Sequence, residues 1–168
     1  MNRQIELFDG ELSHAIFSPC EQYRYALKRH WNPNKEPVAF IGLNPSTADA
    51  SHDDPTIRKC RNFALRWGYG GLIMLNLFAF RATDPRVMKA ATEPIGPEND
   101  WHLRTCARQA KKVFAAWGND GAHLERDRKV LALFPKLWCL HVNEKTGMPQ
   151  HPLYVPGDVQ PLVYRGRP

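Results

Sequence analysis

Cysteine is scarce in this chain, and no two cysteines lie close together. A zinc site usually contains at least one pair of cysteines separated by a few residues, and no such pair occurs here. We therefore expect isolated thiols in or near the core, while a four-cysteine iron–sulfur site with ligands from distant segments stays open as the alternative. The cysteines are Cys20, Cys60, Cys106 and Cys139.

Long apolar runs are also lacking. The mean hydropathy is -0.50, and no stretch approaches the length that crosses a bilayer, which argues against a membrane-spanning protein. The segment 1–12 has no apolar signal core, so we expect a cytoplasmic protein without a membrane partner. With 168 residues, of which 43% are hydrophobic, the chain suits one globular domain over residues 1–168.

Three ligand-binding and catalytic motifs are absent. The sequence contains no G-x-G-x-x-G, no G-x-x-x-x-G-K-[ST] and no G-x-S-x-G. The first two absences argue against a dinucleotide cofactor and a P-loop, and the third argues against the nucleophile elbow of α/β-hydrolases. We expect no cofactor and no resident metal.

Acidic residues are fewer than basic ones. Lysine and arginine number 23, aspartate and glutamate 17, and the net charge is +6. A basic surface permits an anionic partner such as nucleic acid but does not require one. The segment 57–67 gathers four basic residues without an acidic one, which is mild support for such a partner. These four are Arg58, Lys59, Arg61 and Arg66.

What the chain does contain is a series of apolar segments that alternate with amphipathic ones. Continuous apolar runs are typical of strands buried on both faces of a parallel sheet. The alternation predicts an α/β fold with three layers, αβα, around a four-stranded, mostly parallel sheet. The expected strands are 38–43, 72–76, 112–117 and 137–141, and the expected helices are 55–67, 100–110 and 123–134, with one helical turn near 86–91.

Both ends of the chain predict additional strands. Alternating side chains over 13–31 predict an N-terminal β-hairpin with its turn near 18–21. Asp54 before Pro55 is a good N-cap followed by proline at the first helical position, which predicts where the first helix begins. In the tail, 153–155 and 162–164 are short strand candidates.

Ligands of such sheets bind beyond the carboxyl ends of the strands. Asn44 follows the first expected strand, and Pro45 holds it extended. Its amide can orient a water molecule or pair with a base edge, or it can satisfy its own loop. If Asp54 caps the helix, Asp53 is left free to activate water, the alternative being a solvated loop acid near a helix start.

The second expected strand ends in a run of polar and aromatic residues. Asn76 interrupts an apolar segment, so it is either a structural bridge or a ligand-reading residue. Phe78 and Phe80 can stack on a base or belong to the core. Arg81 can hold a phosphate or form a surface ion pair. Late in the chain, His151 in a proline-flanked loop can donate to a developing negative charge, although such a histidine is more often structural.

The stretch 42–45 (Gly-Leu-Asn-Pro), Asn76 at a strand end and the late His151-Pro152 together resemble the uracil-DNA glycosylase superfamily over about residues 38–155. In its mismatch-specific branch, a G-x-N-P-G loop ends the first strand and a later asparagine reads the pyrimidine. A late His-Pro loop helps to hold the DNA strand or the leaving base. The resemblance implies a glycosylase-like fold and a DNA substrate.

A closer resemblance is to a bacterial family of unknown function, which carries no settled activity. It rests on four stretches, 43–49, 53–58, 76–81 and 151–154, and spans nearly the whole chain. The chain departs from the glycosylases in three places. Ser46 replaces a glycine, the late motif is His-Pro-Leu-Tyr in place of His-Pro-Ser, and the acidic stretch 49–58 is not a glycosylase pattern.

The glycosylase resemblance implies hydrolysis of an N-glycosidic bond of a modified or mismatched pyrimidine, with roles for particular residues. Asn44 positions water with Asp53 as a second anchor, Asn76 reads the base, and His151 supports the leaving base. This requires Asn44, Asn76 and His151 to meet at one opening above the sheet. The other expected substrate-binding residues are Pro45, Ser46, Arg58, Phe78, Phe80, Arg81 and Tyr154.

Two other functions fit the same residues. The pocket can hold a free nucleotide or modified nucleoside, with Asp53 and Asp54 supporting a divalent ion. Alternatively, the chain is a non-catalytic DNA-binding accessory module, whose affinity for DNA would fall steeply with salt.

Overall fold

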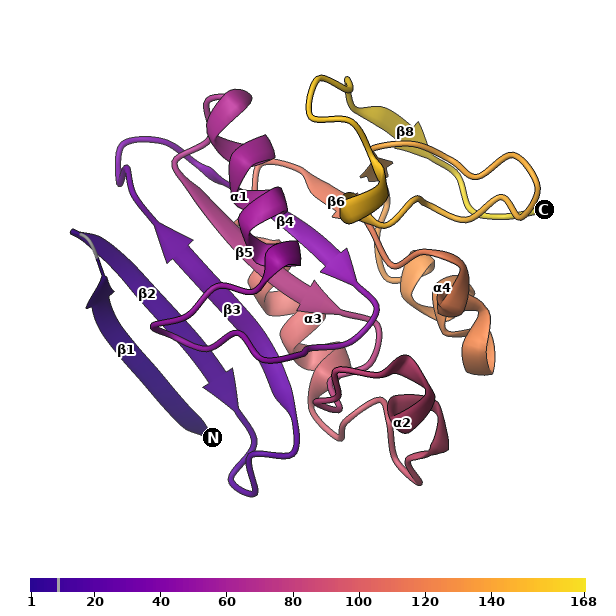
Figure 1. The fold of residues 1–168 in the computed structure, drawn as a ribbon, viewed down its shortest axis with the longest axis horizontal. Helices are drawn as coiled ribbons and strands as arrows, with labels where there is room; N and C mark the ends of the chain where they lie inside the picture. The colour runs from indigo at the N-terminus through magenta and orange to yellow at the C-terminus, as the bar shows by residue number, and fades with distance from the viewer. Residues whose placement is uncertain (9) are drawn as a thin grey trace.

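The computed structural model describes residues 1–8 and 10–168 of the chain. The described residues form an eight-stranded mixed sheet with the strand order β1-β2-β3-β5-β4-β6-β7-β8 (Figure 1). The strands are β1 Asn2–Phe8, β2 Glu11–Phe17, β3 Arg24–His30, β4 Pro37–Gly42, β5 Gly71–Asn76, β6 Val113–Ala115, β7 Leu137–Cys139 and β8 Leu162–Tyr164. The helices are α1 Pro55–Arg66, α2 Pro85–Ala90, α3 Asn99–Ala107 and α4 Arg126–Leu131, with 3-10 helices η1 Asn119–Glu125 and η2 Pro152–Tyr154.

The centre of the sheet is the parallel stretch β5-β4-β6-β7. Every residue of β4 and β5 is buried, which agrees with the continuous apolar runs of the sequence. From β4 the chain passes through α1 to β5 on one side, and it later returns to β6 on the other side of β4. The edge between β4 and β6 is therefore a topological switch point, where ligands of open α/β sheets bind.

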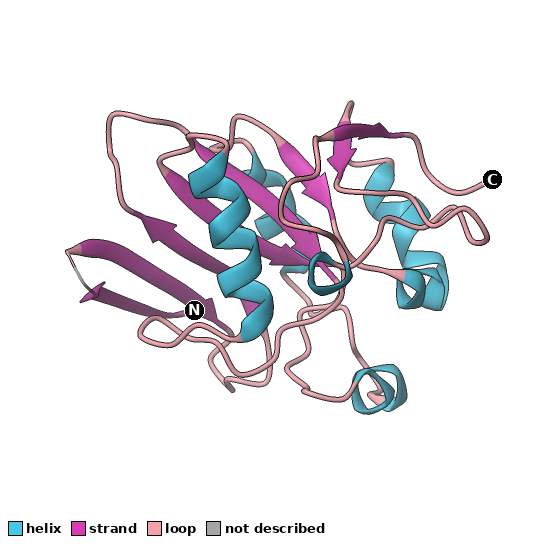
Figure 2. Cartoon of the chain, turned by 45° about the horizontal axis from the view of Figure 1, so that its top comes forward, coloured by secondary structure: helices cyan, strands magenta, loops and turns pink. Residues whose placement is uncertain are grey.

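Helices cover both faces of this sheet. Helix α1 lies over one face and α3 over the other (Figures 1 and 2). Phe63 of α1 belongs to a core with Phe40 and Phe114 from the strands, whereas Leu103 of α3 packs on the opposite face with Ile41. The α/β fold is as predicted, and the central strands have hydrophobic cores on both sides.

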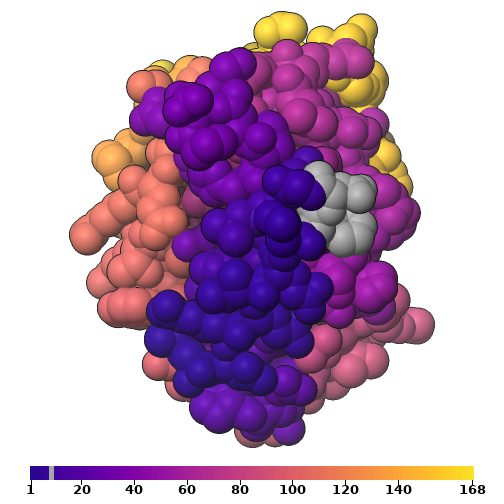
Figure 3. Space-filling view, turned by 90° about the vertical axis from the view of Figure 1, so that its left-hand side faces the viewer, coloured from indigo at the N-terminus to yellow at the C-terminus, as the bar shows by residue number. Residues whose placement is uncertain are grey.

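The expected size of the sheet was wrong. The predicted hairpin exists as β2 and β3, with Ile16 opposite Ala26, but β3 also pairs antiparallel with β5, and β1 extends the sheet further. The residues Tyr25, Ala26 and Leu27 are all buried, a pattern of an interior strand. Pairing with β3 covers the edge of β5. Strand β1 is the edge strand of the sheet and lies on the surface of the molecule (Figure 3).

Local signals located the first helix well and the C-terminal segment less well. The Asp54 Oδ1 accepts a hydrogen bond from the Ile57 N–H at 2.9 Å, so the predicted N-cap is confirmed. The expected helix 123–134 is divided into η1 and α4, because Leu124 and Glu125 have positive φ angles of 55° and 52°. Of the two strands expected in the tail, β8 is confirmed, but 153–155 is wrong because the proline-led turn η2 replaces it.

The cysteines are free thiols in the described structure. Cys60, Cys106 and Cys139 are buried, as expected for isolated thiols of the core, whereas Cys20 is exposed. Within residues 1–8 and 10–168, no group of three or more histidine, cysteine, aspartate or glutamate side chains is arranged to hold a metal ion. None of the helices described is both long and apolar enough to span a bilayer.

Candidate functional site

A pocket of about 540 Å³ opens beyond the carboxyl ends of β4, β5 and β6. Its volume falls in the range of small-molecule sites, and it lies at the switch point between β4 and β6. The loops after these strands, the start of α1 and the turn η2 form its wall. Five of the residues expected in the site line it, and they come from segments far apart in the sequence. They are Asn44, Ser46, Asn76, His151 and Tyr154.

Asn76 is the last residue of β5 and is only 4% exposed. Its side-chain Nδ2 has no hydrogen-bond partner among the described residues. Glycine at position 42 makes room for this amide, because a Cβ there would lie 2.9 Å from the Asn76 Oδ1. A buried amide without a partner is destabilising. In a pocket wall it is the arrangement expected of a group that hydrogen-bonds a ligand.

Asn44 is tied to its own surroundings by one half of its amide. The Nδ2 donates to the carbonyl oxygens of Ala82, at 2.8 Å, and Pro45, at 3.2 Å. The loop-satisfying role left open by the sequence therefore holds for the NH2 group. No donor from the described residues contacts Oδ1, so this oxygen is the atom of Asn44 available to a water molecule or a ligand.

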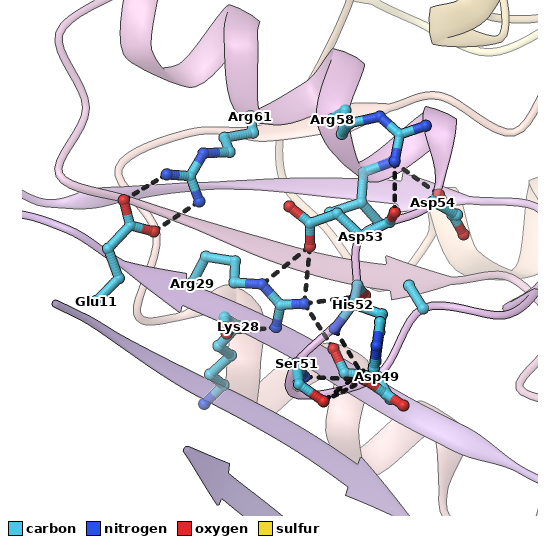
Figure 4. Close-up of polar contacts among 12 residues, drawn as sticks. Glu11, Lys28, Arg29, Asp49, Ser51, His52, Asp53, Asp54, Arg58 and Arg61 are labelled. Atoms are coloured by element: carbon cyan, nitrogen blue, oxygen red, sulfur yellow. Dashed lines mark hydrogen bonds and ion pairs between the residues drawn. The ribbon is translucent and has the colours of Figure 1, made fainter. Parts of the chain in front are cut away.

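Of the two adjacent acids, Asp54 caps α1 as predicted, but the expectation that Asp53 is left free was wrong. Asp53 is not free, because its Oδ1 accepts from Nε and Nη2 of the buried Arg29 at 3.0 and 2.8 Å (Figure 4). Asp53 does not line the pocket, whereas Asp54 does so while capping α1. Capping does not withdraw Asp54 from the pocket, because the capping bond uses only one of its carboxylate oxygens.

His151 enters the pocket as a neutral imidazole. Burial lowers the pKa of His151, and the nearby carboxylate of Asp54 opposes that shift only in part. The Nδ1 accepts from the Leu153 N–H at 3.3 Å, so the proton of the neutral ring lies on Nε2. Gly118, with φ of 71°, donates its N–H to the Pro149 carbonyl at 3.0 Å and ties the loop after β6 to the histidine loop.

The remaining predicted residues lie outside the pocket wall. Phe78 is fully buried in the core, and Phe80 packs edge-on against Tyr23. The Arg81 guanidinium lies 4.8 Å from the centre of the Phe17 ring. Arg58 donates to the backbone carbonyl of Asp53, and Pro45 is buried. The structure therefore brings none of these residues into contact with the pocket: Pro45, Asp53, Arg58, Phe78, Phe80 and Arg81.

Among the other lining residues, the sequence indicated 118–120 as a ligand-facing strand end but assigned no role within it, and it did not indicate Trp117 or Arg24. Trp117, Asn119 and Asp120 line the pocket just after β6, and the rule that ligands bind at strand ends indicates the last two. Arg24 lines it from the start of β3. No local pattern identified Arg24, because its position depends on the pairing of β3 with β5.

Comparison with known proteins relates the chain to one family. The family model described as "Protein of unknown function (DUF1643)" matches residues 24–153, a range that contains all the pocket-lining residues except Tyr154. The expected likeness to a family of unknown function is thus confirmed, and no link to uracil-DNA glycosylases is shown. No curated protein and no solved structure matches the chain.

Proposed function

The chain belongs to the DUF1643 family of proteins of unknown function, and we propose that it hydrolyses the N-glycosidic bond of a modified or mismatched pyrimidine in DNA. The observation that carries this proposal is the buried, unpartnered amide of Asn76 in the pocket wall. Enzymes that act on a base in DNA take it out of the stack and read its edge by hydrogen bonds in a closed pocket. Asn76 supplies a donor of that kind, and the pocket volume of about 540 Å³ suits one nucleoside.

In the proposed reaction, the bond between the sugar C1′ and the base nitrogen breaks and its electron pair leaves with the base. The sugar passes through an oxocarbenium-like state, as in other glycoside hydrolysis. The Nε2–H of His151 donates to the base as negative charge develops on it. A neutral imidazole can fill this role, because its N–H stabilises the developing anion by a hydrogen bond without transferring the proton to it.

Water then attacks C1′, and its proton leaves to a carboxylate or to solvent, which gives an abasic sugar and the free base. Two acids line the pocket, Asp54 and Asp120, but Asp120 pairs with Lys89 at 2.5 Å. One carboxylate oxygen of Asp54 caps the helix, and the other stays available. We therefore assign water activation to Asp54, with Asn44 Oδ1 as the orienting acceptor. Asp53 serves in this scheme only to hold the loop through Arg29.

Contacts to the DNA backbone would come from the surface beside the pocket mouth. Helix α1 begins at the pocket, with Pro55 and Thr56 in its wall, and its solvent-facing side carries Arg58 and Arg66. Tyr154 is 76% exposed at the rim, where an aromatic ring can stack on a base. The net charge of +6 agrees with a phosphate-rich partner.

The test is base excision from labelled oligonucleotides. Single- and double-stranded DNA carrying uracil, mismatched thymine or modified pyrimidines is incubated with the protein, and abasic sites are detected by alkaline strand cleavage. We expect Asn76→Ala, Asp54→Asn and His151→Ala each to lower the excision rate about 100-fold or more, the size of an acid–base contribution. Arg104→Gln, a charge change on the exposed side of α3 and outside the pocket wall, is the control and keeps the chemical rate.

Two outcomes would favour the other functions. DNA binding with a steep salt dependence but no abasic product would identify a non-catalytic accessory module. Thermal stabilisation by free nucleotides or nucleosides, again without excision, would identify a nucleotide-binding protein. Excision that survives the Asn76 and His151 substitutions would refute the roles given to these residues.

A further inference from the structure

The pocket wall contains a buried positive charge that the proposed reaction does not use. Three arginines are 2% exposed, namely Arg24, Arg29 and Arg126. Arg29 pairs with Asp53, and Arg126 pairs with Asp100. Among the residues that the structure describes, no carboxylate lies within ion-pair distance of Arg24, and Arg24 is the member of the three that lines the pocket.

Arg24 also has hydrogen-bonding capacity to spare. Its Nη1 donates to the carbonyl oxygen of Ala48, while Nε is buried without a partner in the described part of the chain. No hydrogen bond from Nη2 to any described residue is formed either. Nε and Nη2 make up the edge of the guanidinium that binds two oxygens of a phosphate or carboxylate at once.

An unpaired charge in this position is energetically costly, because the protein replaces only part of the solvation that water provided. Burial lowers the pKa of Arg24 to about 10, with Asp54 the strongest influence in the other direction, so the side chain stays protonated at neutral pH. Asp54 attracts the guanidinium without touching it. No carboxylate of the described residues therefore pairs directly with this cation.

The loop that Arg24 contacts adds further donors. Ser46 and Thr47 line the pocket, and the backbone N–H groups of residues 46–48 make no hydrogen bond with any residue in the described ranges. Arg24 is tied to this loop through the Ala48 carbonyl. Backbone N–H groups without a partner in the described protein, on a loop that a guanidinium contacts, are further donors available to an anion.

We propose that Arg24 and the loop 46–48 form a phosphate subsite in the wall of this pocket. The ligand class is a nucleotide whose phosphate group binds Arg24 while its base reaches Asn76. That the ligand carries a base rests on the proposed function, whereas the phosphate subsite rests on Arg24 alone. Two sources share the chemistry, a free nucleotide and a phosphodiester of a DNA strand.

The first experiment titrates the full chain with inorganic phosphate by calorimetry and thermal shift, at constant ionic strength against sodium chloride. We expect saturable binding to the wild type and an affinity about tenfold or more weaker in Arg24→Gln, the loss expected for a charge-assisted contact. Arg24→Lys keeps the charge but not the two-donor edge, so its affinity should lie between the two. Arg104→Gln, which removes the same charge from the exposed side of α3, should bind phosphate like the wild type.

Circular dichroism of each variant shows whether it is folded. If Arg24→Gln does not fold, the titrations of the wild type and of Arg24→Lys still test whether Arg24 binds phosphate. Phosphate that stabilises the wild type no more than chloride does, or equal binding by folded Arg24→Gln and wild type, would overturn the subsite.

Comparing ligands identifies the source of the phosphate. A free nucleotide is indicated if a pyrimidine nucleoside monophosphate binds more tightly than the nucleoside, and if Arg24→Gln removes that difference. A strand phosphate is indicated if only a short single-stranded oligonucleotide shows the dependence on Arg24. Phosphate binding without base excision would support the subsite and refute the proposed hydrolysis. Excision without phosphate binding would support the hydrolysis and refute the subsite.

Discussion

At the scale of single residues, the buried arginines show how one side chain serves structure or ligand binding according to its partners. Arg29 donates to the Asp53 carboxylate and to the carbonyl oxygens of Asp49, Lys28 and His52 (Figure 4). It therefore fixes the loop 49–53 on β3, just before the pocket acid Asp54. Arg24, five residues earlier on the same strand, has one such bond and faces the pocket instead.

Replacing Arg29 is expected to damage the fold. Arg29→Met leaves the Asp53 carboxylate without its partner and several carbonyl groups without a donor. We expect a loss of about 3 kcal/mol or more in the free energy of unfolding, typical of breaking a buried ion pair. Urea denaturation followed by circular dichroism measures it.

A surface pair provides the comparison for this prediction. Arg86 pairs with Asp84, and its side chain is 90% exposed. Arg86→Met should cost less than about 1 kcal/mol, because exposed ion pairs contribute little. Equal losses in the two variants would contradict the structural role given to Arg29.

At the scale of elements, α1 connects the core to the pocket. Its inner side carries Ile57, Cys60, Phe63 and Ala64 into the core, and its first residues line the pocket. Asp54 contributes to the helix and to the pocket, because it caps α1 and also lines the pocket. The local signal of an acid before proline thus locates a helix start, and only the fold places that same acid at a site.

Because of this double role, we expect different substitutions of Asp54 to have different effects on the free energy of unfolding but the same effect on excision. Asp54→Ala removes the cap and should lower the free energy of unfolding by about 1 kcal/mol, as N-cap deletions do. Asp54→Asn should cost little stability, since asparagine is also a good N-cap, yet it should lose excision as fully as alanine does. Parallel urea denaturation and excision assays of the two variants measure this. An asparagine variant with wild-type excision would exclude Asp54 as the water-activating group.

At the scale of the whole molecule, the two cores share one sheet, and histidines with lowered pKa values are spread over the structure. His102 is 2% exposed, stacks on Tyr25 at 4.6 Å and has no hydrogen bond to either ring nitrogen within the described residues. Burial lowers the pKa of His102 and of His151, and it lowers that of His14 on β2 with help from Lys28. All three therefore favour the neutral ring in the folded state.

The lowered pKa values predict that the fold loses stability in mild acid. Above the ordinary histidine pKa of 6.5, folded and unfolded chains are both neutral at these sites. Below it, the unfolded chain binds protons that the folded chain does not, so the free energy of unfolding falls as the pH falls. We expect a lower urea midpoint at pH 5.5 than at pH 7.5.

A variant assigns part of this effect to one site. His102→Phe keeps a ring on Tyr25 and removes the titrating group, so the difference between the two midpoints should shrink. The depressed carboxylates Asp49 and Asp84 have ordinary pKa values near 4, so they contribute outside this pH window. A difference unchanged by His102→Phe would show that His102 is not responsible.

The amino-acid sequence by itself determined the features that depend on residues near one another along the chain. Apolar runs and helical spacing located β4, β5 and α1 close to their observed bounds, and Asp54-Pro55 identified the start of α1. The rule that ligands bind at the carboxyl ends of strands then predicted Asn44 and Asn76 as site residues. These features follow from burial and hydrogen bonding within a few residues.

Only the tertiary structure decided which of two local possibilities each side chain takes. It paired β3 with β5, joined Asp53 to Arg29, buried Phe78 in the core and brought Arg24, Asn76 and His151 to one pocket. Each outcome depends on a partner far away in the sequence. Burial and pairing free energies depend on those distant neighbours, so no local pattern carries them.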